Sequence, residues 1–179
     1  MYEEIKQGKM PERLSHLQEN FNDADGNPII DDEGGAVIQP NQGFVIKTKD
    51  STGQKIFINM TYHDLVDKIE EKSVTAEDAA KYGTSERGVR IPLSLGAVRE
   101  DNDKKGEPVQ VMDFIFATDT IKLAQKDASF RQQIAELAFT YIKQKFDKDL
   151  DYRFTVPKMK YKGSTVQYQR IKAKKAPKI

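Results

Sequence analysis

Two short apolar runs that flank a polar turn, between residues 43 and 60, constrain the fold more than any other stretch of this sequence. The runs are Gly43–Lys49 and Gln54–Met60, and the turn between them is Asp50-Ser-Thr-Gly53. β-Branched and aromatic residues on either side of a glycine-containing turn are typical of a β-hairpin. Successive residues of a strand point to opposite faces, so a tight hairpin is expected to bring Lys47 and Lys55 near each other on strands that also carry core residues.

The most hydrophobic run of the chain is Val109–Phe116, which follows Pro108 and predicts a central strand. Asp113 interrupts this run. A buried carboxylate needs hydrogen-bond partners, and we interpret Asp113 as structural or edge-facing rather than catalytic. The segment Val89–Gly96 is predicted to be extended, and its proline suggests an edge position or a bend. We interpret Arg99–Gly106 as a charged turn.

Two helices are expected after the central strand. Thr118 or Asp119 can cap a short helix that extends to Lys126. A longer helix opens at Asp127 or Ser129, where Ser129-Phe-Arg-Gln132 has the pattern of a capping box. Its apolar residues repeat at helical spacing and predict a helix that lies across the sheet. They are Phe130, Ile134, Leu137, Ala138, Tyr141 and Phe146.

The ends of the chain and one internal stretch are expected to lie outside the core. Met10–Phe21 shows a short helical pattern, and the acidic, glycine-rich residues 22–42 are interpreted as a mobile linker. Residues 67–88 are interpreted as an exposed insertion with a short helix from Thr75 to Tyr82. The stretch 165–171 alternates like a strand. The order of elements predicts an α+β fold, with a mixed or antiparallel sheet packed by helices in a single domain.

The composition argues against most catalytic chemistry. The chain has no cysteine, which excludes a disulfide framework, a thiolate zinc site and a thiol nucleophile. Its two histidines, His16 and His63, do not favour a metal centre or a histidine-based triad. No nucleotide-binding, hydrolase or metalloprotease motif occurs. We therefore expect a protein that is not an enzyme and that holds no cofactor or metal. An enzyme that works through a pair of carboxylates stays open as the least favoured alternative.

The sequence also indicates where in the cell the protein is located. No apolar run approaches the roughly 18 residues that cross a bilayer, and the first residues lack the apolar core of a signal peptide. We expect a cytosolic protein with no membrane partner, and the nucleus is an alternative location.

Lysines recur in the ordered parts of the sequence, although the 29 basic residues nearly balance the 28 acidic ones. Lys47 and Lys55 lie in the hairpin, whereas the others lie in the charged turn and near the C-terminal end; these are Lys104, Lys105, Lys158, Lys160 and Lys162. One interpretation is a solvated face. The other is a group of ammonium groups that converges on an anion such as a phosphoryl group, which carries close to two negative charges and three strong acceptor oxygens. Composition alone does not decide between them.

Two uneven charge clusters remain. The stretch 23–34 holds five acids and no base, and it either stays a free linker or folds back onto a basic face. The C-terminal tail carries Arg170, Lys172, Lys174, Lys175 and Lys178, which raises the hypothesis of nucleic-acid binding. The tail has no aromatic platform for bases, so nucleic acid is not the expected partner.

Six segments of this chain resemble, in the same order, those of the PIH domain family of adaptors of the Hsp90 chaperone system. They are Gly43–Thr48, Gly53–Asn59, Ile91–Gly96, Asp103–Gly106, Val111–Phe116 and Lys158–Gly163. The resemblance implies a small α/β domain over residues 41–163 without catalytic activity. It places an N-terminal helix and acidic linker at residues 1–40 and a strand-like basic tail at residues 164–179.

Within this family the chain is most similar to the kintoun subfamily, whose members help to assemble axonemal dynein heavy chains in the cytoplasm. The segments that carry this similarity are Leu65-Val66, Arg99–Lys104, Phe130-Arg-Gln132 and Lys160–Gly163.

The resemblance implies a ligand as well, namely an acidic client peptide phosphorylated on serine, of the type Asp-pSer-Asp-Asp or Asp-pSer-Asp-Glu. Carried over by motif, the lysines expected to bind it are Lys47, Lys55 and Lys105. The family member with known peptide binding uses arginines in its C-terminal basic cluster. This chain offers Arg153, Lys158 and Lys160 instead, and Met159 aligns with one arginine.

The expected partners are therefore a phosphorylated acidic client peptide and the Hsp90 co-chaperone machinery, with a dynein heavy chain as a candidate client. The alternative is a general PIH-type adaptor for other complexes, such as those of RuvB-like ATPases, snoRNPs or kinases. Such an adaptor would hold its partners through its hydrophobic surface without phosphate recognition, and the methionine at position 159 favours this alternative.

Overall fold

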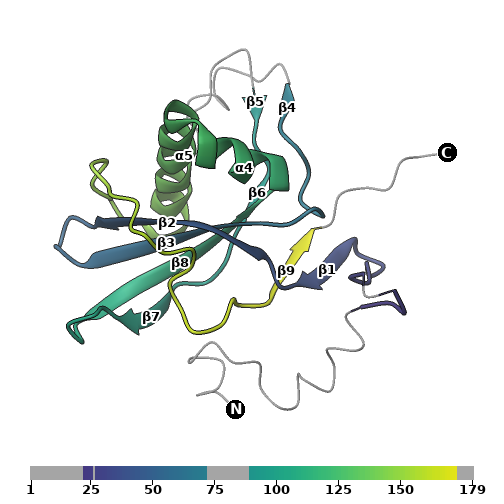
Figure 1. The fold of residues 1–179 in the computed structure, drawn as a ribbon, viewed down its shortest axis with the longest axis horizontal. Helices are drawn as coiled ribbons and strands as arrows, with labels where there is room; N and C mark the ends of the chain where they lie inside the picture. The colour runs from purple at the N-terminus through teal and green to yellow at the C-terminus, as the bar shows by residue number, and fades with distance from the viewer. Residues whose placement is uncertain (1–21, 26, 72–88, 173–179) are drawn as a thin grey trace.

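A computed structural model describes residues 22–25, 27–71 and 89–172. The described part contains a five-stranded mixed sheet, two helices and two small two-stranded sheets (Figure 1). The α+β fold predicted from the order of elements is confirmed. The helices expected at Met10–Phe21 and from Thr75 to Tyr82, and the tail beyond Lys172, lie outside the described residues.

The described residues form nine strands and two helices. In chain order they are β1 (Gly35–Ile38), β2 (Asn41–Lys49), β3 (Lys55–Tyr62), β4 (Glu70–Glu71), β5 (Val89–Arg90), β6 (Leu93–Leu95), β7 (Arg99–Asn102), β8 (Pro108–Phe116), α4 (Thr118–Lys126), α5 (Ala128–Phe146) and β9 (Gln169–Lys172).

The predicted hairpin is formed by β2 and β3, which pair in antiparallel register with Lys49 opposite Lys55 and Lys47 opposite Phe57. Lys47 and Lys55 therefore share one face of the sheet as diagonal neighbours. The register shifts between Asn41 and Phe44, where Gly43 lies against the opposite strand. A Cβ atom at Gly43 would lie 2.1 Å from the Met60 carbonyl oxygen, so the strands can approach this closely only at a glycine.

The predicted central strand is β8, which pairs in parallel with β3 and in antiparallel fashion with both β6 and β7. Its residues from Val111 to Phe116 are buried, as expected for a strand that is covered on both faces. The segment Val89–Gly96 was predicted to be extended, with an edge position or a bend at its proline. It contains β5 and β6, and β6 is the outer strand on that side of the five-stranded sheet. The stretch from Arg99 was interpreted as a turn, but its first four residues form β7 and only residues 103–107 turn.

Both predicted helices are present and cover one face of the sheet (Figure 1). The cap of α4 is the backbone of Ala117 without a side-chain bond, so the expected capping by Thr118 or Asp119 is wrong. The cap of α5 is Asp127, whose carboxylate accepts a hydrogen bond from the Phe130 N–H at 3.1 Å. The residues of α5 that are buried in the core are Ile134, Ala135, Leu137, Ala138, Phe139 and Ile142.

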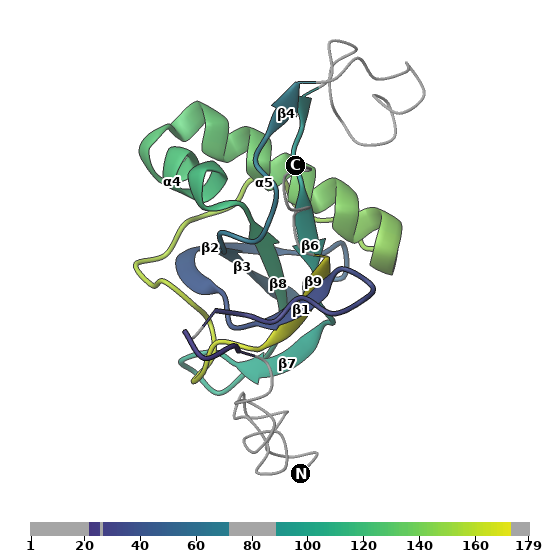
Figure 2. The same ribbon diagram turned by 90° about the vertical axis from the view of Figure 1, so that its right-hand side faces the viewer.

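The opposite face of the sheet is covered by a ribbon made of β1 and β9 and by the segment 157–163. Figure 2 shows the helices on one side of the sheet and the ribbon on the other. Strand β1 pairs with β9 in antiparallel register, from Gly35–Lys172 to Ile38–Gln169. Residues 22–42 were interpreted as a mobile linker. This interpretation is wrong for strand β1, because Ala36 and Ile38 pack with Ile115 and Ile171 in a buried cluster.

Three connections share one turn that begins with an aspartate and ends one residue after a glycine of positive φ. In each, one carboxylate oxygen accepts two backbone N–H groups and closes the loop, as in Asx-type turns. The turns are Asp31–Gly35, Asp50–Gln54 and Asp103–Glu107. The third of them joins β7 to β8 and positions the cluster of charges beside Lys55.

Candidate functional site

The sheet face opposite the helices carries the lysines singled out by the sequence, and Phe57 lies at their centre. Phe57 packs with Val45, Val109 and Val111 and is 5% exposed. The ammonium nitrogen of Lys47 lies 5.8 Å from the centroid of the Phe57 ring, and that of Lys162 lies 5.4 Å from the same centroid. Cations at this distance are attracted by the ring quadrupole. We call the surface formed by Lys47, Lys55, Phe57, Lys162 and the turn 103–107 the lysine face.

The turn that joins β7 to β8 places the backbone of Lys105 beside the carboxylate that binds Lys55. The Lys55 ammonium donates to the Asp103 Oδ2 at 2.9 Å and lies 3.7 Å from Glu107 Oε2. The other carboxylate oxygen of Asp103 accepts from the backbone N–H groups of Lys105 and Glu107. The hydrogen bond from Lys55 holds the pKa of Asp103 down, to about 2, and the same bond raises the pKa of Lys55. Both groups are therefore charged at neutral pH.

Lys47 is fixed by its backbone rather than by an ion pair. Its N–H donates to the Thr155 carbonyl at 2.8 Å, and its carbonyl accepts from the Thr155 N–H at 3.0 Å. The segment around Thr155 therefore pairs with the outer edge of β2. This pairing protects the edge strand and leaves the half-buried Lys47 side chain on the sheet face.

A buried polar cluster under the lysine face holds the segment 157–163 against the sheet. Asp113, interpreted as structural from the sequence, is 2% exposed and accepts hydrogen bonds from Asn59, Arg99 and Tyr161. The partners that a buried carboxylate needs are thus present. Burial, followed by the negative charge of Asp113, raises the pKa of Tyr161 to about 12.

The same cluster anchors the backbone of Lys162. Asn59 accepts from the Lys162 N–H at 2.7 Å and donates to its carbonyl at 3.1 Å, and Arg99 donates to that carbonyl at 2.6 Å. The Lys162 ammonium donates to the Asn102 carbonyl at 2.6 Å and lies 3.8 Å from Asp101 Oδ2. Its side chain is 16% exposed.

Three other residues were expected at the site from the sequence, namely Arg153, Lys158 and Lys160. Among the described residues, no recorded contact joins any of them to Phe57. Lys158 and Lys160 are exposed, and Met159 between them packs against the apolar cluster around Phe57. The Arg153 side chain is 92% exposed, with its guanidinium 3.4 Å from Asp151. Lys162 lies on the lysine face, although the sequence did not place it among the expected site residues. In the sequence, Lys162 alternates with Lys158 and Lys160 and looks like them. Its backbone differs from theirs because it is hydrogen-bonded to the buried polar cluster.

The acidic stretch does not reach the lysine face through its described carboxylates. Asp31 and Glu33 pair with Arg170 of β9 at 2.9 and 3.4 Å. The first basic residue of the tail is therefore partly neutralised within the ribbon, and this ion pair ties the two ends of the domain together.

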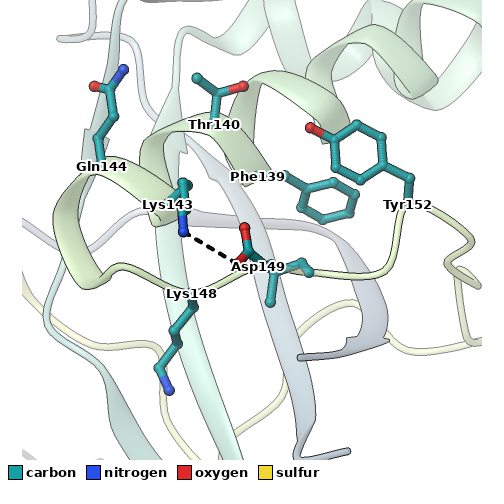
Figure 3. A pocket seen from close by; sticks show the side chains of 8 residues that line it. Phe139, Thr140, Lys143, Gln144, Lys148, Asp149 and Tyr152 are labelled. Atoms are coloured by element: carbon teal, nitrogen blue, oxygen red, sulfur yellow. Dashed lines mark hydrogen bonds and ion pairs between the residues drawn. The ribbon is translucent and has the colours of Figure 1, made fainter. Parts of the chain in front are cut away.

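A separate pocket of about 220 Å³ lies between the C-terminal end of α5 and the segment 148–152. Figure 3 shows the Phe139 and Tyr152 rings on one side and the Lys143 ammonium bonded to Asp149 on the other. The rings lie 5.3 Å apart, and Phe139 is buried whereas Tyr152 is 53% exposed. None of the site residues expected from the sequence lines this pocket, and its volume is below the range of roughly 300–1,000 Å³ typical of small-molecule sites.

Over residues 22–25, 27–71 and 89–172, no group of three or more histidine, aspartate or glutamate side chains is arranged to hold a metal ion. Neither described helix is long and apolar enough to cross a bilayer.

The fold and the sequence together define the class of protein. The family model of the PIH1 N-terminal domain matches residues 22–179, a range that includes both strands of the ribbon. The chain therefore belongs to the PIH1 N-terminal domain family. The N-terminal domain of yeast PIH1p has the same fold, with a TM-score of 0.64 and 27% identity over 76% of this chain and 92% of that chain.

Among full-length relatives, the chain is similar to the protein kintoun of several animals, as the resemblance predicted. It is 33% identical to that of Drosophila willistoni over 129 residues, 32% identical to that of Xenopus laevis over 129 residues and 31% identical to that of Aedes aegypti over 141 residues. These matches cover 70–75% of this chain. The chain spans only 15–16% of the length of these relatives.

Proposed function

We propose that this domain is a non-enzymatic adaptor that binds acidic phosphoserine peptides on the lysine face. The observation that supports the proposal is the placement of Lys47 and Lys55 on one face of the hairpin, beside the turn that carries Lys105. A phosphoserine brings close to two negative charges and three acceptor oxygens to such a surface. Each charge-assisted hydrogen bond to an ammonium group is stronger than a neutral one. Arg153, Lys158 and Lys160 stay in the proposal as exposed cations for the acidic residues that flank the phosphate.

The role that we propose for this binding is to link client proteins to the Hsp90 chaperone machinery. The similarity to kintoun supports the cytoplasmic pre-assembly of axonemal dynein arms as the process, with a dynein heavy chain as a candidate client. Family membership supports a co-chaperone adaptor rather than an enzyme. Pull-down of tagged protein from ciliated-cell cytosol, with the Lys47→Ala/Lys55→Ala variant as control, tests this role; capture of dynein and chaperone by both proteins alike would contradict it.

The binding chemistry is tested with a fluorescent Asp-pSer-Asp-Asp peptide and its unphosphorylated twin. The wild-type domain is expected to bind the phosphorylated peptide at least about tenfold more tightly, because the lysines meet a doubly charged group. Lys47→Ala/Lys55→Ala should remove this preference. Equal affinity for the two peptides, or full affinity in the double variant, would refute phosphate recognition.

A second function is favoured by Met159, which packs against the apolar cluster under the lysine face in place of a cation. In this alternative the domain is a general PIH-type adaptor that holds its partner through apolar contacts. Exposed charge pairs are screened by salt, whereas apolar contacts are not. A complex that survives phosphatase treatment and 1 M salt would favour this function, and its loss under either condition would exclude it.

A further inference from the structure

Lys162 differs from the other basic residues of its segment because the fold fixes its backbone. The Lys162 N–H donates to Asn59, and its carbonyl accepts from Asn59 and Arg99. Both partners also donate to the buried Asp113. Lys158 and Lys160 point to solvent. A cation on an anchored backbone loses less conformational entropy when it binds an anion than one on a free segment.

The Lys162 ammonium is also aimed at the surface that carries Lys47. Both ammonium groups lie within 6 Å of the centroid of the Phe57 ring. The ring is buried, so the two lysines approach it from a common surface of the sheet and extend their stems over it. Among the described lysines, only Lys47 and Lys162 have an ammonium group this close to the Phe57 ring.

The described partners of Lys162 neutralise its charge less than those of Lys55 do. The Asp101 carboxylate lies 3.8 Å away, at the outer limit of an ion pair, and the short bond goes to the neutral Asn102 carbonyl. Lys55, in contrast, is bonded at 2.9 Å to a carboxylate that two backbone N–H groups also hold. A phosphate dianion competes more easily for an ammonium whose nearest acceptor is neutral.

We infer that Lys162 and Lys47, whose ammonium groups both lie within 6 Å of the centroid of the Phe57 ring, are the cations that contact the phosphate, and that Lys162 supplies the charge that Met159 does not. This inference rests on the proposed phosphopeptide function and names the residue that completes its site. The phosphate then bridges the two ammonium groups, and Lys158 and Lys160 contribute only long-range attraction to the acidic residues that flank it.

The test compares four single variants of the full chain in binding the fluorescent Asp-pSer-Asp-Asp peptide: Lys47→Met, Lys162→Met, Lys158→Met and Lys160→Met. Methionine keeps the apolar stem over Phe57 and removes the charge, and the backbone bonds of residue 162 do not depend on its side chain. Lys162→Met and Lys47→Met are each expected to weaken binding about tenfold, and Lys158→Met and Lys160→Met by no more than about twofold. Lys162→Arg should restore most of the affinity.

The outcomes separate the inference from the function on which it rests. If the wild type prefers the phosphorylated peptide and Lys162→Met binds like the wild type, the inference is wrong and the proposed function stands. If Lys162→Arg binds the peptide as weakly as Lys162→Met while both retain the wild-type melting temperature, the shape of the lysine side chain and not its charge determines the affinity. The inference then also fails. If the wild type does not distinguish the two peptides, the proposed function itself fails.

Discussion

At the scale of single residues, carboxylates of this chain already neutralise part of the positive charge of the lysine face. Asp103 is the strongest of these internal partners, because it closes its own turn with one oxygen and binds Lys55 with the other. In the proposed complex, an anionic group of the peptide that binds Lys55 must therefore compete with Asp103. On this proposal Asp103 closes the turn and at the same time lowers the affinity for the peptide.

Replacing Asp103 by asparagine separates these two effects. The asparagine oxygen can still accept from the Lys105 and Glu107 N–H groups, so the turn is kept, while the charge that holds Lys55 is lost. Phosphopeptide affinity is expected to rise by about threefold to tenfold, measured by fluorescence anisotropy. Glu107→Gln, which removes a carboxylate 3.7 Å from Lys55, is the control and should have a smaller effect. Unchanged or weaker binding in Asp103→Asn would contradict the competition.

The buried hydroxyl of Tyr161 predicts a loss of stability in alkali. The pKa of Tyr161 is raised to about 12 from 10.0, so the folded state keeps a proton that the unfolded state has released. Stability from this group is therefore complete below pH 10 and is lost as the pH rises toward 12. Urea unfolding should show a free-energy loss of about 1 kcal/mol between pH 8 and pH 11 beyond that of Tyr161→Phe. Identical alkaline slopes in both proteins would contradict this assignment.

At the scale of elements, residue periodicity predicted those parts whose burial follows a regular pattern. The hairpin, the central strand and both helices were found because their apolar residues repeat at strand or helix spacing. Strand β7 was missed because its sequence, Arg-Glu-Asp-Asn, has no apolar face and is held by the neighbouring strand. Strand β1 was missed because it follows an acidic, glycine-rich stretch and gains its partner only at the other end of the chain.

The same distinction applies to the site. Lys47 and Lys55 were predicted because they lie within a local hairpin whose register follows from its turn. The position of Lys162 depends on Asn59, Arg99 and Asp113, which come from three different strands. No local pattern encodes such an arrangement. The one available signal was the aspartate within the hydrophobic run, which required a buried donor from elsewhere in the chain.

The hairpin itself makes a prediction that distinguishes two glycines. Gly43→Ala places a methyl group 2.1 Å from the Met60 carbonyl oxygen and 2.8 Å from the Ile121 side chain, which forces the strand and α4 apart. Gly53 has a φ of +88° but open space around it, so Gly53→Ala strains only the turn. We expect losses of about 3 kcal/mol and about 1 kcal/mol respectively in urea unfolding. Equal losses would show that the strands do not pack this closely at Gly43.

At the scale of the whole molecule, the ribbon of β1 and β9 makes the two ends of the described chain part of one domain. Ile171 is 3% exposed and packs with Ile38 and Ile115, so it joins the last strand to the central one. The ribbon lies on the same side of the sheet as the lysine face. Segments that the sequence suggested were a linker and a tail therefore pack on the face of the sheet that carries the lysine face.

Ile171→Ala tests whether the ribbon belongs to the cooperative unit. Loss of this buried side chain is expected to lower the free energy of unfolding by about 2–4 kcal/mol. Lys172→Ala, at the exposed neighbouring position, should change it by no more than about 0.5 kcal/mol. If the two variants are equally stable in urea, the ribbon docks without contributing to the stability of the sheet.

The most direct measurement of the central claim is an NMR titration of the ¹⁵N-labelled domain with the Asp-pSer-Asp-Asp peptide. The account predicts that the largest amide shifts fall at Lys47, Phe57, Lys105 and Lys162, and that the unphosphorylated peptide leaves them unchanged. Shifts that cluster instead at the pocket of Phe139 and Tyr152, or that appear equally with both peptides, would contradict it.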